Sequence, residues 1–193
     1  MEDLTICQVC TQSESYVRFG EEYLCLDCYN EVMAKHLGVS ATNYPEGVMI
    51  KDGQGGAHQF RLRKRLDPIG IIMDAEEEHD GGYQFREYGE LHEDQGELLL
   101  RLLDKVKKGM LEVYIEESEF PNGQKYHLLP NDRFVGRVEP SRADRDTPLL
   151  SVDGKYYTWE EVGQILMHYE GFQVKVEMVD ISEEIEWKKE QRE

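Results

Sequence analysis

Four cysteines carry the clearest chemistry in this sequence. Cys7 and Cys10 form one Cys-x2-Cys pair, and Cys25 and Cys28 form a second pair after fourteen intervening residues. A two-residue gap lets both thiolates of a pair bind one ion, and four thiolates complete a tetrahedral shell with bonds of about 2.3 Å. Such a shell leaves no position for water, so it stabilises structure and does not catalyse. We therefore predict one structural Zn²⁺ ion held by these four residues.

Two other uses of the same cysteines stay open. A thiol redox pair needs only one Cys-x-x-Cys motif, and thiolates also suit an iron–sulfur cluster or another metal. All the cysteines lie in the first 28 residues, whereas a secreted disulfide protein would usually spread them along the chain. The N-terminal sequence has neither the basic flank nor the apolar segment of a signal peptide. We therefore expect a cytoplasmic protein.

The elements around the cysteines follow from local patterns. Residues 16–19 and 23–24 flank a glycine-containing turn and predict a β-hairpin. Apolar residues at near-helical spacing after the second pair predict a helix that ends at Gly38. His36 lies near the end of this helix, where a cation is favoured, and four thiolates already fill the metal shell. The order of knuckle, hairpin and helix over residues 4–38 resembles treble-clef zinc fingers, which include nucleic-acid binders, ubiquitin-pathway modules and plain structural modules.

The rest of the chain predicts an α+β fold. We divide the sequence into a four-cysteine zinc-finger module (1–40), a linker and turn region with one short apolar stretch (41–56) and an α+β domain (57–193). Helices are expected at 93–108 and after the capping box at 158–161. Strands are expected at 57–66, 69–73, 82–88, 111–115, 125–129, 133–138, 149–152, 155–157 and 172–179. Short links between strands favour a mainly antiparallel sheet domain with two or three helices after the small treble-clef finger.

The first strand of this domain has one apolar and one basic face. Apolar side chains alternate with arginines, and a lysine interrupts the apolar face; the candidate residues for anion or partner binding are Arg61, Arg63, Lys64 and Arg65. Three arginines on one face could hold a phosphate, a nucleic-acid strand or a carboxylate-rich protein. The alternative is ion pairing with acids on neighbouring strands, which we favour.

Motifs for catalysis are absent from the sequence. The histidines are dispersed without a His-Glu-x-x-His pair, and no serine has a Gly-x-Ser-x-Gly setting. The acidic run Glu76-Glu77-Glu78-His79-Asp80 could bind a cation or a basic partner, but we expect a solvated loop. We therefore assign no catalytic residue, and an enzyme would need a cleft near His58, His127 or this acidic run.

Charge restricts the classes of partner. The formal net charge of −18 opposes binding to nucleic-acid phosphates and to anionic lipid, and it favours basic partners. No apolar run approaches the roughly 20 residues that span a bilayer. The finger, the glycine-rich turn, the strand pairs and the Asp-Gly-Lys hairpin together resemble uncharacterised bacterial families with an N-terminal zinc finger, and no activity follows from that resemblance.

The sequence therefore favours a zinc-binding, non-enzymatic protein-interaction module with a protein partner and no membrane contact. One alternative is a nucleic-acid-binding protein that uses the finger and the Arg61/Arg63/Arg65 strand. The other alternative is an enzyme of unknown class.

Overall fold

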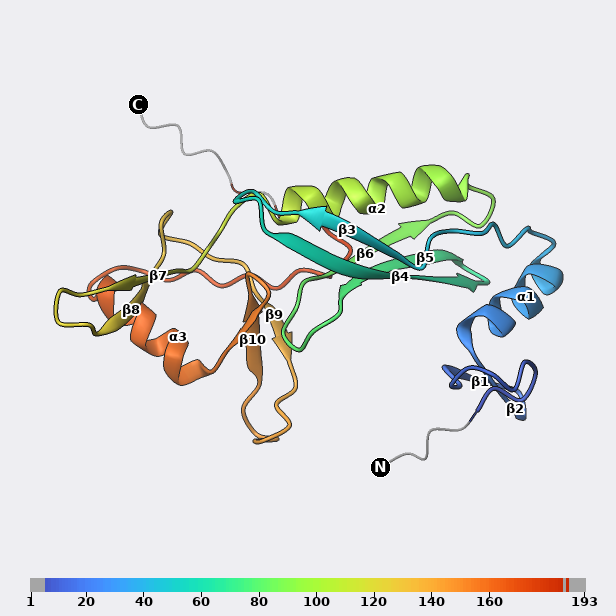
Figure 1. Cartoon of the computed structure of the whole chain (residues 1–193), viewed down its shortest axis with the longest axis horizontal. Coiled ribbons are helices and arrows are strands. Elements are labelled where there is room, and N and C mark those ends of the chain that lie inside the picture. Colours follow the sequence, from blue (N-terminus) through green and yellow to red (C-terminus); the bar gives the residue numbers. More distant parts are fainter. Residues whose placement is uncertain (1–5, 186, 188–193) are drawn as a thin grey trace.

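The computed structural model describes residues 6–185 and 187, and it is an α+β protein with three α-helices and antiparallel sheets. The helices are α1 (Leu26–Leu37), α2 (Gln95–Gly109) and α3 (Trp159–Leu166), and a 3-10 turn η1 (Met167–Tyr169) follows α3. The strands are β1 (Val17–Phe19), β2 (Glu22–Leu24), β3 (Gly47–Lys51), β4 (Ala57–Asp67), β5 (Gly70–Glu77), β6 (Gln84–Gly89), β7 (Glu116–Glu119), β8 (Lys125–Leu128), β9 (Arg137–Glu139), β10 (Leu149–Val152) and β11 (Lys155–Tyr157). The molecule is elongated: α1 lies at one end, α3 at the other, and the largest sheet lies between them (Figure 1). No helix in the described part of the chain combines the length and apolarity that a membrane span requires.

The N-terminal module forms as its local signals predict. β1 pairs with β2 around a turn at Gly20, whose φ of 64° lies in the left-handed region that favours glycine. Cys25 caps the start of α1, and its sulfur accepts a hydrogen bond from the N–H of Cys28. Gly38 ends the helix with a φ of 68°, as a glycine after the last turn commonly does. The predicted hairpin and the predicted helix end are both confirmed.

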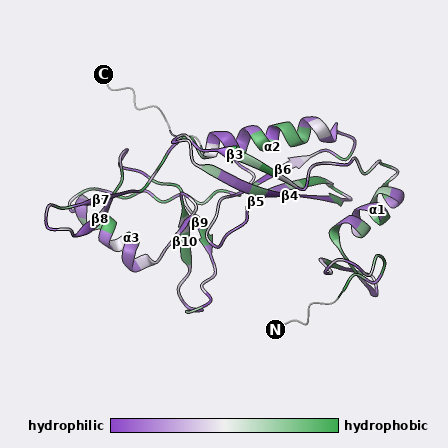
Figure 2. Ribbon diagram, viewed as in Figure 1, coloured by the Kyte–Doolittle hydropathy of each residue, from purple (hydrophilic) through white to green (hydrophobic). Residues whose placement is uncertain are grey.

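The central sheet has the order β3-β4-β5-β6, and α2 packs on one of its faces. Asp94 caps α2 by accepting from two backbone N–H groups, and Leu98, Leu102 and Val106 of the helix are fully buried. Figure 2 shows hydrophilic and hydrophobic residues alternating along α2, as expected for a helix with one face on a sheet. The residues buried between the helix and the sheet include Phe60, Leu62, Leu66, Ile71, Met73, Leu98, Leu102 and Val106.

The finger and the sheet share one core because α1 completes the edge of β4. β3 covers only the first part of β4, so beyond Arg61 no described strand pairs with β4 on the side away from β5. Asn30 of α1 fills this place: its Nδ2 donates to the Lys64 carbonyl over 2.6 Å, and its Oδ1 accepts from the N–H of Leu66 over 2.9 Å. The hydroxyl of Tyr44 accepts from the N–H of Lys64 over 3.0 Å. Side chains therefore satisfy backbone groups that a neighbouring strand would otherwise satisfy.

Lys64 of β4 binds both the segment that follows α1 and the start of α2. Its side chain lies on the face that packs against α2 and is only 2% exposed. Its Nζ donates to the carbonyl of Thr42 and to Oε1 of Gln95, and it lies 4.9 Å from the centre of the Tyr44 ring. Burial lowers the pKa of this lysine. The segment before β3 is therefore packed against α2.

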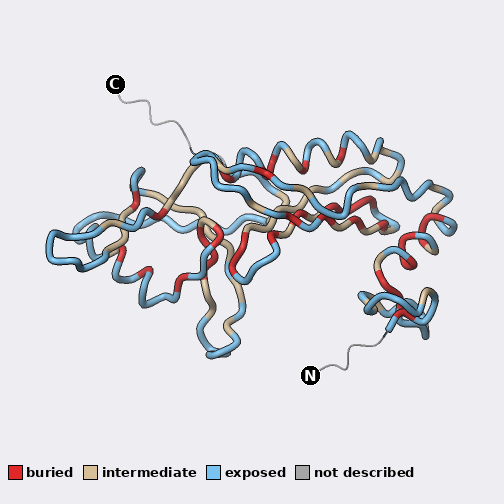
Figure 3. Tube along the Cα trace, viewed as in Figure 1, coloured by how far each residue is buried: buried red, intermediate tan, exposed pale blue. Residues whose placement is uncertain are grey.

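A second core lies around β9, β10, β11 and α3. Asp153 and Gly154 form the predicted two-residue hairpin turn, both with positive φ. The predicted capping box opens α3. Ser151 joins this region to the central sheet by donating to the Gly81 carbonyl over 2.5 Å. Figure 3 shows buried residues in both regions, and those of the second core are Ile115, Leu129, Leu150, Val152, Tyr157, Val162 and Ile165.

Three predicted strands and the predicted acidic loop are wrong in whole or in part. Residues 111–115 form no strand, since the N–H groups of Tyr114 and Ile115 donate to the Asp153 carboxylate over 2.8 Å. Only the end of the predicted strand 133–138 pairs, as β9. Residues 172–179 are extended but have no partner strand among the described residues. Glu76 and Glu77 of the acidic run belong to β5, where they lie opposite Arg61 and Phe60 of β4. The predicted domain boundaries stay predictions.

Replacing Asn30 by alanine tests the link between the finger and the sheet. Asn30→Ala leaves one buried N–H and one buried carbonyl of β4 without partners, and each such group costs about 1–3 kcal/mol. We expect the free energy of unfolding, measured by urea denaturation, to fall by about 2–4 kcal/mol. The exposed Asn43, changed to alanine, is the matched control and should leave stability unchanged. Equal stability of the two variants would show that Asn30 does not support β4.

Candidate metal centre

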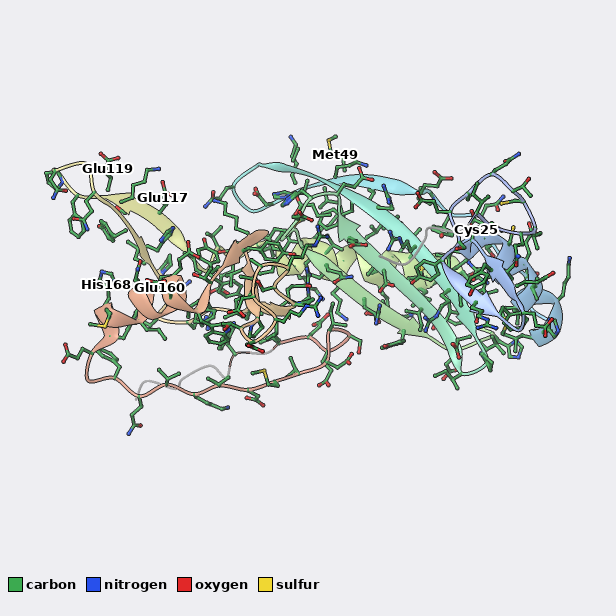
Figure 4. The ribbon with its side chains drawn as sticks, turned by 90° about the horizontal axis from the view of Figure 1, so that it is seen from below. Cys25, Met49, Glu117, Glu119, Glu160 and His168 are labelled. Atoms are coloured by element: carbon green, nitrogen blue, oxygen red, sulfur yellow. The ribbon has the colours of Figure 1, made fainter. Side chains whose placement is uncertain are left out.

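Two local structures bring the four cysteine sulfurs together. Cys7 and Cys10 lie in a tight turn before β1, which the N–H of Thr11 closes by donating to the Cys7 carbonyl over 2.9 Å. Cys25 and Cys28 lie at the cap and in the first turn of α1. Figure 4 labels Cys25 at this end of the molecule. The turn at Cys7 and Cys10 and the start of α1 therefore bring the four sulfurs together, although the β1–β2 hairpin separates them in the sequence.

The distances between the sulfurs suit one metal ion. All four Sγ atoms lie within 4.8 Å of one another, and Cys10 Sγ is 3.8 Å from Cys25 Sγ. A tetrahedral ion with metal–sulfur bonds of about 2.3 Å separates its ligands by about 3.8 Å. All four are free cysteines, and three of them are buried. Among the described residues, this is the group of cysteine, histidine and acidic side chains that could hold a metal ion.

The surroundings of the thiols divide them into two kinds. Burial opposes ionisation of Cys7, but backbone hydrogen bonds outweigh it and lower the pKa to about 6. Backbone N–H groups of Gln12 and Ser13 also lower the pKa of Cys10. Burial raises the pKa of Cys25 and of Cys28. A cation among the four sulfurs favours the thiolate form of all of them, so metal binding and ionisation support each other.

His36 lies outside the cluster of sulfurs. Its Nδ1 donates to the Val32 carbonyl one turn earlier in α1, over 2.8 Å, and its ring packs edge-on against Phe19. It therefore supports the end of the helix, as the sequence suggests.

The three arginines of β4 have acidic partners within the chain. Arg61 donates twice to Glu78 Oε1, over 3.2 and 3.0 Å, and Arg63 Nη1 lies 3.0 Å from Glu76 Oε2. Arg65 Nη2 lies 3.8 Å from Asp67 Oδ2. Lys64 does not join this group, because it points to the opposite face and is buried under Tyr44 and α2.

The hollow beside these arginines is lined mostly by acids. It encloses about 450 Å³, and its lining residues are Arg61, Arg63, Glu76, Glu77, Glu78, His79 and Asp80. Four carboxylates against two guanidinium groups give this surface a negative balance. The surface is therefore poorly suited to a phosphate or a nucleic-acid backbone.

His58 belongs to a cluster of side chains that the sequence does not reveal. Its Nδ1 lies 2.6 Å from Glu77 Oε1, and its Nε2 lies 3.0 Å from Asp52 Oδ2. Glu77 is buried at the end of β5, where its second oxygen accepts from the N–H of Tyr83 and its first also lies 3.1 Å from His79 Nε2. Asp52 in turn accepts from two backbone N–H groups of the glycine-rich turn. In the sequence, His58 and the acidic run that contains Glu77 are separate candidates, and only Asp52 is close to His58 along the chain.

This cluster works as a clamp and not as a general base. Both ring nitrogens of His58 face carboxylates, so neither is available to take a proton from a substrate. Burial pushes the pKa of His58 down, but hydrogen bonds to Asp52 and Glu77 outweigh burial and raise it. The hydrogen bond between His58 and Asp52 is the main cause that lowers the pKa of Asp52. The imidazole therefore ties the glycine-rich turn to the end of β5, and its protonated form is the one that both carboxylates favour.

Because His58 lies between two carboxylates, we expect its contribution to the stability of the fold to decrease as pH rises. The folded-state pKa of His58 is raised above 6.5, so its stabilisation is complete below that value and is lost as pH rises through the folded-state pKa. We expect the loss of unfolding free energy in His58→Gln to be larger at about pH 6 than at about pH 9, measured by urea denaturation. The exposed His92, changed to glutamine, is the control and should show no such trend. A loss that is equal at both pH values would argue against a charged clamp.

Three family models match successive parts of the chain, and each is described as a domain of unknown function. They are DUF7685 over residues 6–40, DUF7686 over residues 42–111 and DUF7713 over residues 114–183. The first match contains the four cysteines and α1, the second contains the central sheet and α2, and the third contains the second core. No curated protein and no solved structure matches the chain. The four cysteines therefore all lie within one match, and none of the three descriptions names an activity.

Proposed function

We propose that this chain is a zinc-stabilised, non-enzymatic protein-interaction module of the cytoplasm. The observation that carries the proposal is the four-thiol cluster within a core that continues into the central sheet. A metal ion there is enclosed by protein ligands, so it supports the surfaces around it. We infer that those surfaces carry out the function of the protein by contacting other proteins.

Zinc and a treble-clef finger account best for the N-terminal module. Four thiolates at tetrahedral distances suit Zn²⁺. The order of knuckle, hairpin and a helix capped by Cys25 is the order of a treble clef. The shell has no open position, so the ion supplies folding energy to a module too small to fold by its apolar core alone.

Protein contact is better supported than nucleic-acid contact. The arginines of β4 are paired with acids, and the hollow beside them is mostly acidic. The net charge of −18 adds a general repulsion for phosphates. Large apolar side chains are instead exposed after α3, where a protein surface could cover them.

Metal content and metal removal test the structural role. We expect about one zinc per chain after purification without chelator, and Cys28→Ser should lose the metal. Because the finger and the sheet share one core, this variant should also lower the temperature at which the sheet unfolds. Ser40→Ala, at an exposed serine outside the cluster, is the control. Less than about half a zinc per chain, or metal loss that leaves the sheet as stable as before, would contradict the proposed role.

A mobility-shift assay separates the two classes of partner. We expect no shift of single- or double-stranded DNA or RNA at low salt, where electrostatic binding is strongest. A shift that weakens with added salt and disappears when Arg61, Arg63 and Arg65 are changed to glutamate would replace the protein-interaction proposal with a nucleic-acid-binding one.

A further inference from the structure

The segment 172–179, after α3, is extended and belongs to none of the sheets that the described residues form. Apolar and polar residues alternate along it, and four apolar side chains are between 67% and 75% exposed, namely Phe172, Val174, Val176 and Met178. In Figure 4 this segment follows α3 and runs along the outside of the molecule. A pattern that suits a half-buried strand therefore lies open to solvent.

Both ends of the segment are anchored to the body of the protein. The ring of Phe172 packs edge-on against Tyr169, with 5.7 Å between the ring centres. Beyond the other end, Lys105 of α2 donates to the carbonyl of Ser182. The segment between these anchors belongs to none of the sheets that the described residues form. An anchored, extended backbone outside any sheet is a template for another strand.

The charges on the segment match a second copy of itself. In an antiparallel pair centred on Val176, Lys175 of one copy lies opposite Glu177 of the other, and this pairing occurs twice. Val174 then lies opposite Met178, so that apolar side chains meet on one face and opposite charges meet on the other. The segment carries no net charge although the whole chain carries −18.

The charged face is already arranged for this pairing within one copy. Lys175 Nζ donates to Glu177 Oε2 over 2.8 Å, so the two side chains lie next to each other on the same face. A second copy in the antiparallel register adds another lysine and another glutamate beside them. Each charge then has an opposite charge both along its own strand and across the pair.

Other registers lose this match. Centring the pair on Lys175 or on Glu177 places two like charges opposite each other, which is unfavourable. A shift by one residue places apolar side chains opposite charged ones. A parallel in-register pair places each lysine next to the lysine of the other copy. The antiparallel register about Val176 is therefore the one that pairs lysine with glutamate and keeps the apolar residues together.

We propose that two copies of this chain associate through residues 173–179 as an antiparallel strand pair with its two-fold axis at Val176. The interface is isologous, since each copy contributes the same segment. This inference deepens the proposed function, on which it rests, by naming a second copy of the chain as one protein partner.

Sedimentation of the purified full-length chain tests the pairing. At about 50 µM protein and about 0.15 M salt, where charges more than about 8 Å apart are screened, we expect a dimer with twice the chain mass of 22.5 kDa. Lys175→Glu places two acids opposite two acids, and Glu177→Lys places two bases opposite two bases. Each single variant should weaken the dimer at least about tenfold.

An equimolar mixture of the two variants supplies the decisive comparison. A chain with Lys175→Glu and a chain with Glu177→Lys are complementary across the two-fold axis, so the mixture should recover the dimer that each variant alone weakens. Lys51→Glu, the same charge change at an exposed site on β3, is the matched control and should dimerise like the unchanged chain. Circular dichroism of each variant checks that the fold is unchanged, as expected for exposed side chains.

Three results would overturn this inference. The first is a monomeric unchanged chain, the second is a dimer that both single variants leave unweakened, and the third is a mixture that stays monomeric. Each result concerns purified chain alone, so it would leave standing the proposal that the protein binds a different protein partner. Absence of zinc, or a salt-sensitive nucleic-acid shift, would instead remove the proposed function itself.

Discussion

The open edge of β4 is the constraint on which the N-terminal half of the molecule depends. A strand longer than its neighbour leaves backbone N–H and carbonyl groups that must find partners when they are buried. Asn30 supplies one donor and one acceptor at the spacing of a peptide group, and Tyr44 supplies a further acceptor. This arrangement works only if α1 lies in one position beside the strand. The sheet therefore determines where the finger must be.

The cysteine cluster places the same helix from its other side. Cys25 caps α1, Cys28 lies in its first turn, and Asn30 follows two residues later. Two of the four residues that would hold the metal, and the residue that completes the sheet, thus lie close together at the start of one helix. Their buried neighbours form one continuous core. In the proposed metal-bound protein, loss of the ion would be transmitted to β4 through this short helix, because the N-terminal module shares its core with the sheet.

Local features of this fold can be predicted from the sequence, and long-range pairings cannot. The cysteine spacing, the Gly38 helix end and the Asp153-Gly154 turn are short-range signals, because a few adjacent residues determine each conformation. Asn30 binds backbone groups 34 and 36 positions away, and nothing in its own neighbourhood indicates this. Glu77 looks like one member of a solvated acidic run, yet its position at the end of β5 buries it against His58.

The predicted strand at 172–179 shows a different limit. Alternation of apolar and polar residues reports that a segment suits one face of a sheet, but it does not report whether the chain provides the neighbouring strand. The basic groups of β4 are already paired within the chain, since its arginines face acids and His58 lies between two carboxylates. What the fold leaves exposed on this segment is a row of apolar side chains on an extended backbone outside its sheets. The proposed association between two copies therefore depends on shape and backbone pairing, and the large negative charge of the chain limits which other surfaces can approach.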